Sequence, residues 1–549
     1  MSDIEILDDS FEPKAVHDHF MELTGLRHPS GDEDEVRKHV ADCIKKIEGV
    51  EFLYYEPDAK YPGKRVIVLR RKGSGNYASA PYVTLQAHMD MVCSPDKNIF
   101  PLHIFGYSEN KGPKWIKALK ESSISSPEEN IQDPDKGTTL GADDGIGVAT
   151  MLAILEDSEL KQYPIECLFT VQEETDMGGA ANYDKNLLIG RRYINLDAEV
   201  ANTIIYGSAG GRTVQYEGDV TLLPVTEDFI TLELSVLNLR GGHSGVNINN
   251  GRLNAIKVLT GVLIRLNKRL TNLDVTGEGI RSYDLRLISM NSLTDQEIEE
   301  IIEARKKGDI KIPTVNKIPT WAKARIAIQR AENYDFKDDF DAYCEALKAQ
   351  SQPEEDTFCW KVEEINSVQT PLDEASTDAL LCLLQQIPNG VIHMIPSRPE
   401  VVEISSNLAA IEPIELNDGK VVIMSLNRSS NSDSMEALIQ IQENIGKLFK
   451  YDVKNFDPYP IWQPDDNSVL LNKAKDVYRD KELYGDETRA TVIHAGLECS
   501  YIVQNYGDEI DCISIGPTIV NPHTGGERLQ ADTVGTFYKA VTRIIQSLF

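Results

Sequence analysis

The 549-residue sequence has no uninterrupted apolar run of the ~18 residues that a helix needs to cross a bilayer. Its first residues, Met-Ser-Asp-Ile-Glu-Ile-Leu-Asp-Asp, are acidic and lack the apolar segment of a secretion signal. Basic residues are outnumbered, with 56 Lys and Arg against 87 Asp and Glu and a net charge of −31. Nucleic acids and anionic membranes need a cationic surface. We therefore expect neither as a partner, and we expect a cytoplasmic location.

Cysteine is scarce as well. The eight cysteines form no Cys-x-x-Cys pair, which argues against a disulfide framework and against a sulfur-ligated zinc site, so most should be buried, reduced thiols. The sequence also lacks a Gly-x-x-x-x-Gly-Lys-Ser/Thr loop, which argues against a phosphate-binding enzyme.

The remaining composition is that of a soluble globular enzyme, with 41% hydrophobic and 26% charged residues. A single core rarely grows to this length, so two or more domains are expected. In the first ~200 residues, helical and strand-like patterns alternate, which is typical of an α/β domain with a mostly parallel central sheet. The predicted helices are 32–47 and 145–155, and the predicted strands are 65–70, 82–87, 165–171 and 193–196.

The pattern changes after Gly210-Gly211. Residues 229–237 alternate apolar and polar side chains, as in an antiparallel sheet with one solvated face. The last ~100 residues return to the earlier style. We therefore predict a discontinuous catalytic domain, residues 1–207 and 453–549, with an inserted α+β lid domain, residues 208–452. The polar stretch Ser94–Gly137 is predicted to be a long surface insertion, partly mobile.

Five separated segments each place an acidic residue or a histidine at the end of an apolar, strand-like run. They are Gln-Ala-His88-Met-Asp90, Gly-Ala-Asp143-Asp144-Gly, Gln-Glu173-Glu174-Thr, Asn-Leu-Asp197-Ala-Glu and Asn-Pro-His523-Thr. Side chains at the carboxyl ends of strands meet at one edge of an open α/β sheet. Two histidines and three carboxylates suit a pair of divalent metals, zinc best, with manganese or cobalt also fitting. One glutamate is left over as a base, so the pattern indicates metal-assisted hydrolysis.

The acidic segments have plainer interpretations too. Asp143-Asp144 can be a turn that caps the next helix, a role that suits Asp144, and Glu173-Glu174 can be a surface loop. If the backbone there is extended, the two glutamates point in opposite directions, one to bind metal and one to face water. Asp90 is placed to accept the second ring N–H of His88.

Together the motifs resemble the cytosolic non-specific dipeptidases, also called aminoacyl-histidine or Xaa-His dipeptidases, of the di-zinc aminopeptidase clan that includes carnosinase. The resemblance rests on Ala-His-Met-Asp, Thr-Leu-Gly-Ala-Asp-Asp-Gly-Ile-Gly, Gln-Glu-Glu-Thr, Gly-Gly-His-Ser-Gly and His-Ala-Gly-Leu-Glu-Cys, which occur in family order along nearly the whole chain.

The resemblance implies a dipeptidase that hydrolyses unblocked dipeptides, Xaa-His among them, with two zinc ions per subunit. It implies that Asp143 bridges the metals, that His88 and Asp197 complete one site, and that Glu174 and His523 complete the other. Glu173 becomes the general base and Asp90 orients His88. In the lid, His243 stabilises the oxyanion and Arg428 binds the substrate carboxylate. Glu498 is expected to meet the α-ammonium, and His494 is a further candidate for substrate binding.

These lid and substrate assignments have alternatives. His243 can stabilise a turn between glycines, Arg428 can form a surface ion pair, and Glu498 and His494 can cap or pack a helix. The other histidines, among them His19 and His39, are expected to be structural or surface residues.

The stretch 94–137 is longer than in relatives, and Thr-Gly-Gly-Glu follows His523 where relatives often carry Ser-Pro-Asp-Glu. Rival functions are an aminoacylase-like or tripeptide-cleaving amide hydrolase, or a non-catalytic protein on the same fold. Relatives often dimerise through the lid, so a homodimer is expected, although His243 can also reach its own subunit's site.

Overall fold

The computed structural model describes residues 4–56, 58–93, 100–270, 283–307, 313, 315–351, 355–366, 369–417 and 419–549. They form two compact units, unit 1 (Met1–Ser208, Trp462–Val492, Leu497–Phe549) and unit 2 (Ala209–Ile461, Ile493–Gly496). The second boundary lies later than the expected 452/453, because residues 452–459 pair with a strand of unit 2. The C-terminal segment also returns to unit 2 for four residues.

The main sheet of unit 1 has eight strands in the order β2-β3-β8-β4-β9-β23-β10-β22. The four central strands β8, β4, β9 and β23 are parallel, whereas β2, β3 and β10 run antiparallel to their neighbours. Their bounds are β2 Val50–Tyr54, β3 Ile67–Arg71, β4 Val83–His88, β8 Ile165–Thr170, β9 Arg192–Asn195, β10 Thr203–Ser208, β22 Arg489–Ile493 and β23 Asp511–Ser514. The predicted α/β class with a parallel centre is confirmed.

Burial explains why these segments became strands. Every residue of β4 and β8 is buried, which is the pattern of parallel strands covered on both faces. The helices of unit 1 are α1 Lys14–Leu23, α2 Asp34–Ile44, α3 Pro62–Arg65, α4 Pro127–Asn130, α5 Ala142–Glu156, α6 Glu173–Asp176, α7 Gly178–Asn182, α13 Val469–Tyr478, α14 Cys499–Tyr506 and α15 Ala531–Ser547. Residues 145–155 of α5 are all buried, so this helix is central to the unit.

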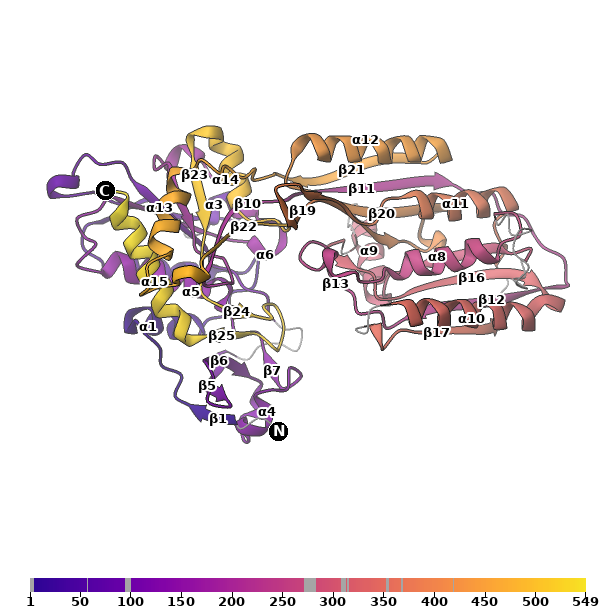
Figure 1. Ribbon diagram of the computed structural model, residues 1–549, viewed down its shortest axis with the longest axis horizontal. Helices are drawn as coiled ribbons and strands as arrows, with labels where there is room; N and C mark the ends of the chain where they lie inside the picture. The colour runs from indigo at the N-terminus through magenta and orange to yellow at the C-terminus, as the bar shows by residue number, and fades with distance from the viewer. Residues whose placement is uncertain are drawn as a thin grey trace. The chain divides into compact units, whose positions relative to one another are not determined.

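A second, antiparallel sheet in unit 1 was not expected from the sequence. It contains β1 Ile4–Leu7, β5 His103–Glu109, β6 Lys114–Leu119, β7 Gly137–Thr138, β24 Ile519–Val520 and β25 Arg528–Gln530. The stretch 94–137 is therefore not simply a surface insertion: β5, β6 and β7 join strands from both ends of the chain (Figure 1). Residues 94–99 lie outside the described residues.

Unit 2 is built on antiparallel sheets, in the orders β18-β19-β20-β11-β21, β14-β16-β12-β17 and β13-β15. The strands are β11 Gly210–Asp219, β12 Phe229–Leu237, β13 Gly242–His243, β14 Arg286–Asn291, β15 Lys317–Ile318, β16 Ala322–Gln329, β17 Cys359–Ile365, β18 Gly390–Ile395, β19 Arg398–Ile411, β20 Lys420–Ser429 and β21 Asp452–Tyr459. The helices are α8 Ala255–Leu266, α9 Asp295–Lys307, α10 Asn333–Gln350, α11 Glu374–Gln386 and α12 Ser432–Phe449.

One hydrophobic core joins the sheets and helices of unit 2. In β12 the inward residues Ile230, Leu232 and Leu234 are buried and alternate with partly exposed ones, as the sequence predicts. They pack with α8, whose buried face includes Leu259 and Leu263. Figure 1 shows α8 lying along β16 and β12.

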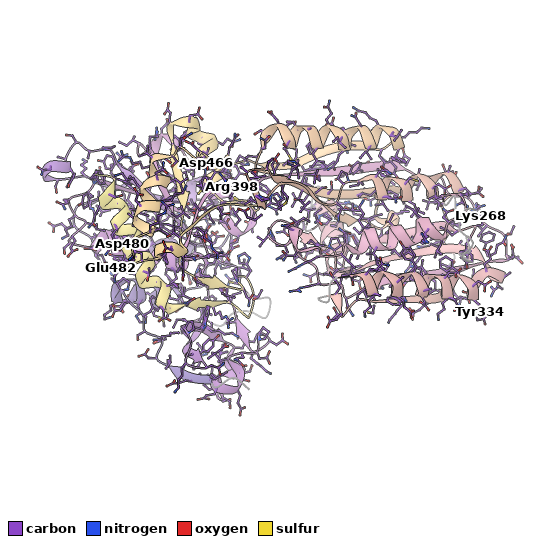
Figure 2. The ribbon with its side chains drawn as sticks, viewed as in Figure 1. Lys268, Tyr334, Arg398, Asp466, Asp480 and Glu482 are labelled. Atoms are coloured by element: carbon purple, nitrogen blue, oxygen red, sulfur yellow. The ribbon has the colours of Figure 1, made fainter. Side chains whose placement is uncertain are left out.

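The acidic surface is partly neutralised by local ion pairs. Asp480 and Glu482, labelled in Figure 2, follow α13 and accept hydrogen bonds from Arg543 of α15 at 2.9 and 2.6 Å. Exposed pairs of this kind contribute little to stability, typically below about 1 kcal/mol each. Within the described ranges, no helix combines the length and the hydropathy needed to span a membrane.

Candidate metal centre

The acidic and histidine side chains gather at one edge of the main sheet of unit 1. His88 is the last residue of β4, Glu173 and Glu174 follow β8, and Asp197 follows β9. Because these three strands are parallel neighbours, their carboxyl ends lie at the same edge. Asp143, near the start of α5, completes the group from the helix side.

Asp143 lies between the two histidines. Its Oδ1 is 3.1 Å from Nε2 of His88, and its Oδ2 is 3.1 Å from Nε2 of His523. On one side, Asp197 Oδ1 is 3.5 Å from His88 Nε2, and on the other, Glu174 Oε2 is 2.8 Å from His523 Nε2. The 3.5 Å separation matches the roughly 3.3–3.8 Å between donors bound to one zinc ion. The separations of 2.8 and 3.1 Å are shorter and are hydrogen-bond distances. The side chains form two three-donor groups that share one carboxylate.

The donor set also fits a cation electrostatically. Burial, together with the charge of Asp143, raises the pKa of the Glu174 carboxyl to about 7. Burial raises the pKa of Asp197 to about 6 despite His88. Glu173, crowded by Asp197 and Glu174, has its pKa raised well above its usual value, chiefly by burial. In addition, the buried Oε1 of Glu174 has no hydrogen-bond partner among the described residues. Such crowded carboxylates are stabilised by a bound cation.

Asp90 supports this cluster through its main chain and its side chain. Its backbone oxygen lies 3.0 Å from Nδ1 of His88, closer than its own carboxylate at 3.5 Å. A proton on Nδ1 donated to that oxygen leaves Nε2 facing Asp143 and Asp197. The carboxylate instead accepts the backbone N–H groups of Glu173 and Glu174 at 3.1 and 3.2 Å.

Asp144 caps the helix, as the plainer interpretation proposed. Its Oδ1 accepts the N–H of Gly147 at 3.1 Å, and its Oδ2 accepts the N–H of His88 at the same distance. The same side chain therefore connects the first turn of α5 to the end of β4.

The backbone at Glu173 and Glu174 differs from the expectation. The two residues are not extended but begin α6, after Gln172 in a left-handed conformation with φ 59°. The expectation that the two glutamate side chains point in opposite directions rests on an extended backbone, and it therefore does not apply. The turn after β8 reverses the chain at once, and the two backbone N–H groups held by Asp90 fix where the glutamates start.

Two acidic residues near the cluster were missed from the sequence. Glu527 is buried, and its carboxylate accepts the N–H groups of Leu140 and Ala142 at 2.7 and 2.8 Å, directly before Asp143. Burial and the charges of Asp143 and Asp197 raise the pKa of Glu199 to about 8. Glu199 could have been found from the sequence, because it lies two residues after the candidate ligand Asp197. Glu527 ends the Thr-Gly-Gly-Glu segment after His523, and it holds the loop before Asp143.

Glu498 is fully buried in unit 1. Its Oε2 accepts hydrogen bonds from Gln86 Nε2 at 2.5 Å and Thr170 Oγ1 at 2.7 Å. It precedes α14 but makes no side-chain capping bond, so the capping alternative does not hold. Burial raises its pKa to about 8, and the charges of His88 and Asp197 act on it, which places it close to the cluster.

Unit 2 carries its own polar cluster around His243. Nδ1 of this histidine lies 3.2 and 3.1 Å from the N–H groups of Gly245 and Val246, which donate to it. The turn-stabilising alternative is therefore observed. Because Nδ1 accepts, the proton of the neutral ring lies on Nε2. The 3.3 Å contact of Nε2 with Nη2 of Arg428 therefore brings two N–H donors together and is not a hydrogen bond.

Arg428, in β20, is buried, with 4% of its surface exposed. Its Nη1 donates to the hydroxyl of Tyr459, and its Nε has no hydrogen-bond partner among the described residues. No carboxylate of the described ranges pairs with it, so the surface ion-pair alternative is wrong. Gly211, opposite Arg428 in β11, is required here because a Cβ would lie 2.1 Å from the Tyr459 ring.

His494 belongs to the same cluster in unit 2. Its Nε2 lies 2.7 Å from Oγ of Ser405 in β19. Burial and the charge of Arg428 lower the pKa of His494 to about 3, so the ring is neutral at physiological pH. The cluster therefore presents a fixed cation among neutral polar groups, an arrangement suited to a carboxylate.

Comparison with known proteins agrees with the fold and the cluster. No protein-family model matches the chain. The chain is 30% identical over 543 residues to the cytosol non-specific dipeptidase of Escherichia coli K12, and the match covers 98% of each of the two chains. The structure of this chain is similar to that of aminoacylhistidine dipeptidase from Vibrio alginolyticus, with a TM-score of 0.73 and 26% identity. That match covers 98% of this chain and 97% of the other.

A tripeptidase from Staphylococcus aureus shares the fold alone, with a TM-score of 0.50, 14% identity and coverage of 98% and 99%. The fold and the carboxylate–histidine cluster define a metallopeptidase. The chain belongs to the cytosol non-specific dipeptidase family.

Proposed function

We propose that this protein is a cytoplasmic dipeptidase that hydrolyses unblocked dipeptides, Xaa-His among them, with two zinc ions per subunit. One observation carries the proposal: each carboxylate oxygen of Asp143 lies 3.1 Å from a different histidine. Such a shared carboxylate is what a pair of cations requires. His88 and Asp197 would hold one ion, and Glu174 and His523 would hold the other.

Two bound cations would lower the pKa of a water and polarise the scissile carbonyl. Glu173 takes the proton of that water and delivers it to the leaving amine. Burial raises the pKa of the Glu173 carboxyl well above its usual value, which strengthens it as a proton acceptor. Asp90 holds the backbone of Glu173 and, through its main-chain oxygen, the ring of His88.

The polar cluster of unit 2 would recognise the substrate. Arg428 binds the C-terminal carboxylate, and the Nε2–H of His243 donates to the tetrahedral oxyanion, a contact often worth about 3–4 kcal/mol. His494 keeps the surroundings of Arg428 neutral. In unit 1, Glu498 would meet the substrate α-ammonium through its buried Oε1, which has no hydrogen-bond partner among the described residues. Because both ends of the substrate are charged and both would be held, short unblocked peptides are favoured.

We further propose that the protein is a homodimer, as is common for relatives with a lid. In that assembly His243 acts either in its own subunit or in the partner's.

A substrate panel combined with metal analysis tests the proposal. We expect release of amino acids from dipeptides, including β-alanyl-histidine, with two zinc ions per chain in the catalytic centre. A clear preference for tripeptides or N-acyl amino acids would favour the rival amide hydrolases. No turnover with the metals bound would favour a non-catalytic protein.

Glu173→Gln tests the base directly. We expect kcat to fall by at least about a thousandfold, a typical contribution of general-base catalysis, while the metal content stays that of wild type. Asp176→Asn in the same short helix, an exposed residue, is the matched control and should keep activity. Near-normal turnover of Glu173→Gln would refute the assignment.

A further inference from the structure

We propose that His19, Glu22, His39 and Cys43 form a second divalent-cation site, separate from the catalytic cluster. They lie on α1 and α2 of unit 1. The ligand atoms of His19, Glu22 and Cys43 all lie within 4.8 Å of one another. Nε2 of His39 is 3.2 Å from Oε2 of Glu22 and 3.6 Å from Sγ of Cys43.

The spacing along each helix explains how four donors can converge. His19 and Glu22 are three residues apart on α1, and His39 and Cys43 are four residues apart on α2. Residues with these spacings share one face of a helix. Two helices therefore supply two donors each. The separations are 3.2 Å for His39–Glu22, 3.6 Å for His39–Cys43 and 4.0 Å for His19 Nδ1–Glu22. They bracket the roughly 3.3–3.8 Å expected between donors of one tetrahedral ion.

His19 is held in the orientation that such a site requires. Its Nε2 pairs with Oε2 of Glu156, the last residue of α5, at 3.1 Å. A carboxylate on one ring nitrogen is the usual partner of a metal-bound histidine, because it fixes the tautomer and leaves the other nitrogen for the ion. That other nitrogen, Nδ1, is buried and has no hydrogen-bond partner among the described residues.

The chemistry of the four donors points to zinc. Two imidazoles, a thiolate and a carboxylate are the mixed nitrogen, sulfur and oxygen ligands that zinc accepts. Cys43 is 6% exposed, whereas the side chain of Glu22 is 56% exposed, so the ion can enter from solvent. On binding, the Cys43 thiol loses its proton to water, and the resulting thiolate and the Glu22 carboxylate together balance the charge of the divalent cation.

The site would fasten the N-terminal helices to the core. Glu156 ends α5, and the regular part of this helix starts at Gly145, 11 residues earlier, because the backbone of Asp143 and Asp144 is not helical. At 1.5 Å per residue this regular part is about 16 Å long, and Asp143 precedes it. An ion at this distance takes no part in hydrolysis. Its role would be structural, holding α1 and α2 against the far end of the helix that carries Asp143.

Cobalt provides a test that does not depend on activity. The catalytic cluster contains no sulfur ligand, so near-ultraviolet thiolate-to-cobalt absorption reports this site alone. We expect that band when the chelator-treated full-length protein is titrated with Co²⁺. We expect Cys43→Ser to abolish it and to bind one cobalt fewer while dipeptide hydrolysis remains. Cys382→Ser, which changes a cysteine of α11 outside the cluster, should keep the band.

Further variants keep the test decisive if Cys43→Ser fails to fold. Glu156→Gln and Glu22→Gln change more exposed side chains, and the Co²⁺ concentration at half-maximal absorption should rise about 10–100-fold for Glu156→Gln and at least as much for Glu22→Gln. The proposal is overturned if wild-type protein shows no thiolate band with excess Co²⁺, or if these variants titrate like wild type.

Discussion

At the scale of single residues, Asp90 shows how one residue can position two parts of the cluster through its main chain and its side chain. Its main-chain oxygen faces Nδ1 of His88, and its two carboxylate oxygens hold the N–H groups of Glu173 and Glu174. Ser30 also donates to the carboxylate at 2.7 Å. The end of β4 and the start of α6 are therefore positioned together, although 83 residues separate Asp90 from Glu173.

Arg428 offers a prediction about specificity. We expect Arg428→Ala to reduce kcat/KM for a dipeptide with a free C-terminal carboxylate by about 10–100-fold, because a charge-assisted hydrogen bond is worth about 1.5–3 kcal/mol. Turnover of the corresponding dipeptide amide should change little, so the preference for acid over amide should collapse. Steady-state kinetics on the matched pair of substrates gives the answer.

The control for this variant lies on the neighbouring strand. Arg212 of β11 is paired with Glu436 at 2.8 Å and is not part of the polar cluster. Arg212→Ala should therefore keep the preference of wild type. If Arg428→Ala lowered both substrates equally, its role would be structural and not recognition of the carboxylate.

At the scale of helices, Gly261 in α8 is a position that can be improved. A Cβ added there meets no atom within 4 Å, and glycine inside a helix costs roughly 0.5–1 kcal/mol relative to alanine. Gly261→Ala should raise the melting temperature of unit 2 by about 2 °C in calorimetry.

Gly147→Ala in α5 should lower the melting temperature of unit 1 in the same measurement, since its Cβ would lie 2.2 Å from Asp144 Oδ1.

Secondary structure was predictable where burial imposes a pattern. The apolar runs that became β4 and β8 are buried along their full length, and hydrophobic residues dominate them. The strands β5 and β6 escaped detection because polar groups occupy them, including the buried Lys117, which donates to the carbonyl of Ile131 at 2.7 Å. A strand that carries a buried lysine, whose ammonium is hydrogen-bonded to a carbonyl, lacks the run of apolar residues by which buried strands are predicted.

The residues of the site were predictable where they belong to contiguous sequence motifs. His88, Asp143 and Glu173 occur in contiguous motifs that carry their own signal. Glu527 could not be found this way, because its function depends on backbone N–H groups of residues 140 and 142, which are 387 and 385 positions away. Hydrogen bonds to the main chain leave no trace in the identity of the donor residue.

At the scale of the whole molecule, metal removal should weaken the fold. The catalytic cluster gathers carboxylates whose pKa values are raised by burial and mutual repulsion. A cation relieves that repulsion, and saturation at a thousandfold over Kd stabilises the folded state by about 4 kcal/mol. We expect a chelator to lower the melting temperature of unit 1 and abolish hydrolysis, and added Zn²⁺ to restore both. An unchanged melting curve after verified metal loss would contradict this.

Mixing two inactive variants distinguishes the possible arrangements of the dimer. Glu173→Gln removes the base in unit 1, and His243→Ala removes the donor in unit 2. If each site takes His243 from the partner, subunit exchange creates one intact site in half of the dimers, and about a quarter of wild-type activity returns. If each subunit uses its own His243, the mixture stays inactive. Sedimentation analysis supplies the oligomeric state that both outcomes require.

The short return of the chain into unit 2 has a consequence for how such enzymes diverge. Ile493–Gly496 is separated from residues 209–461 by Trp462–Val492 of unit 1, yet it supplies His494 to the cluster around Arg428. A recombination event that exchanged only the long central segment between relatives would join a new Arg428 to an inherited His494. If Arg428 recognises the substrate as proposed, a chimaera must transplant both segments to transfer substrate preference.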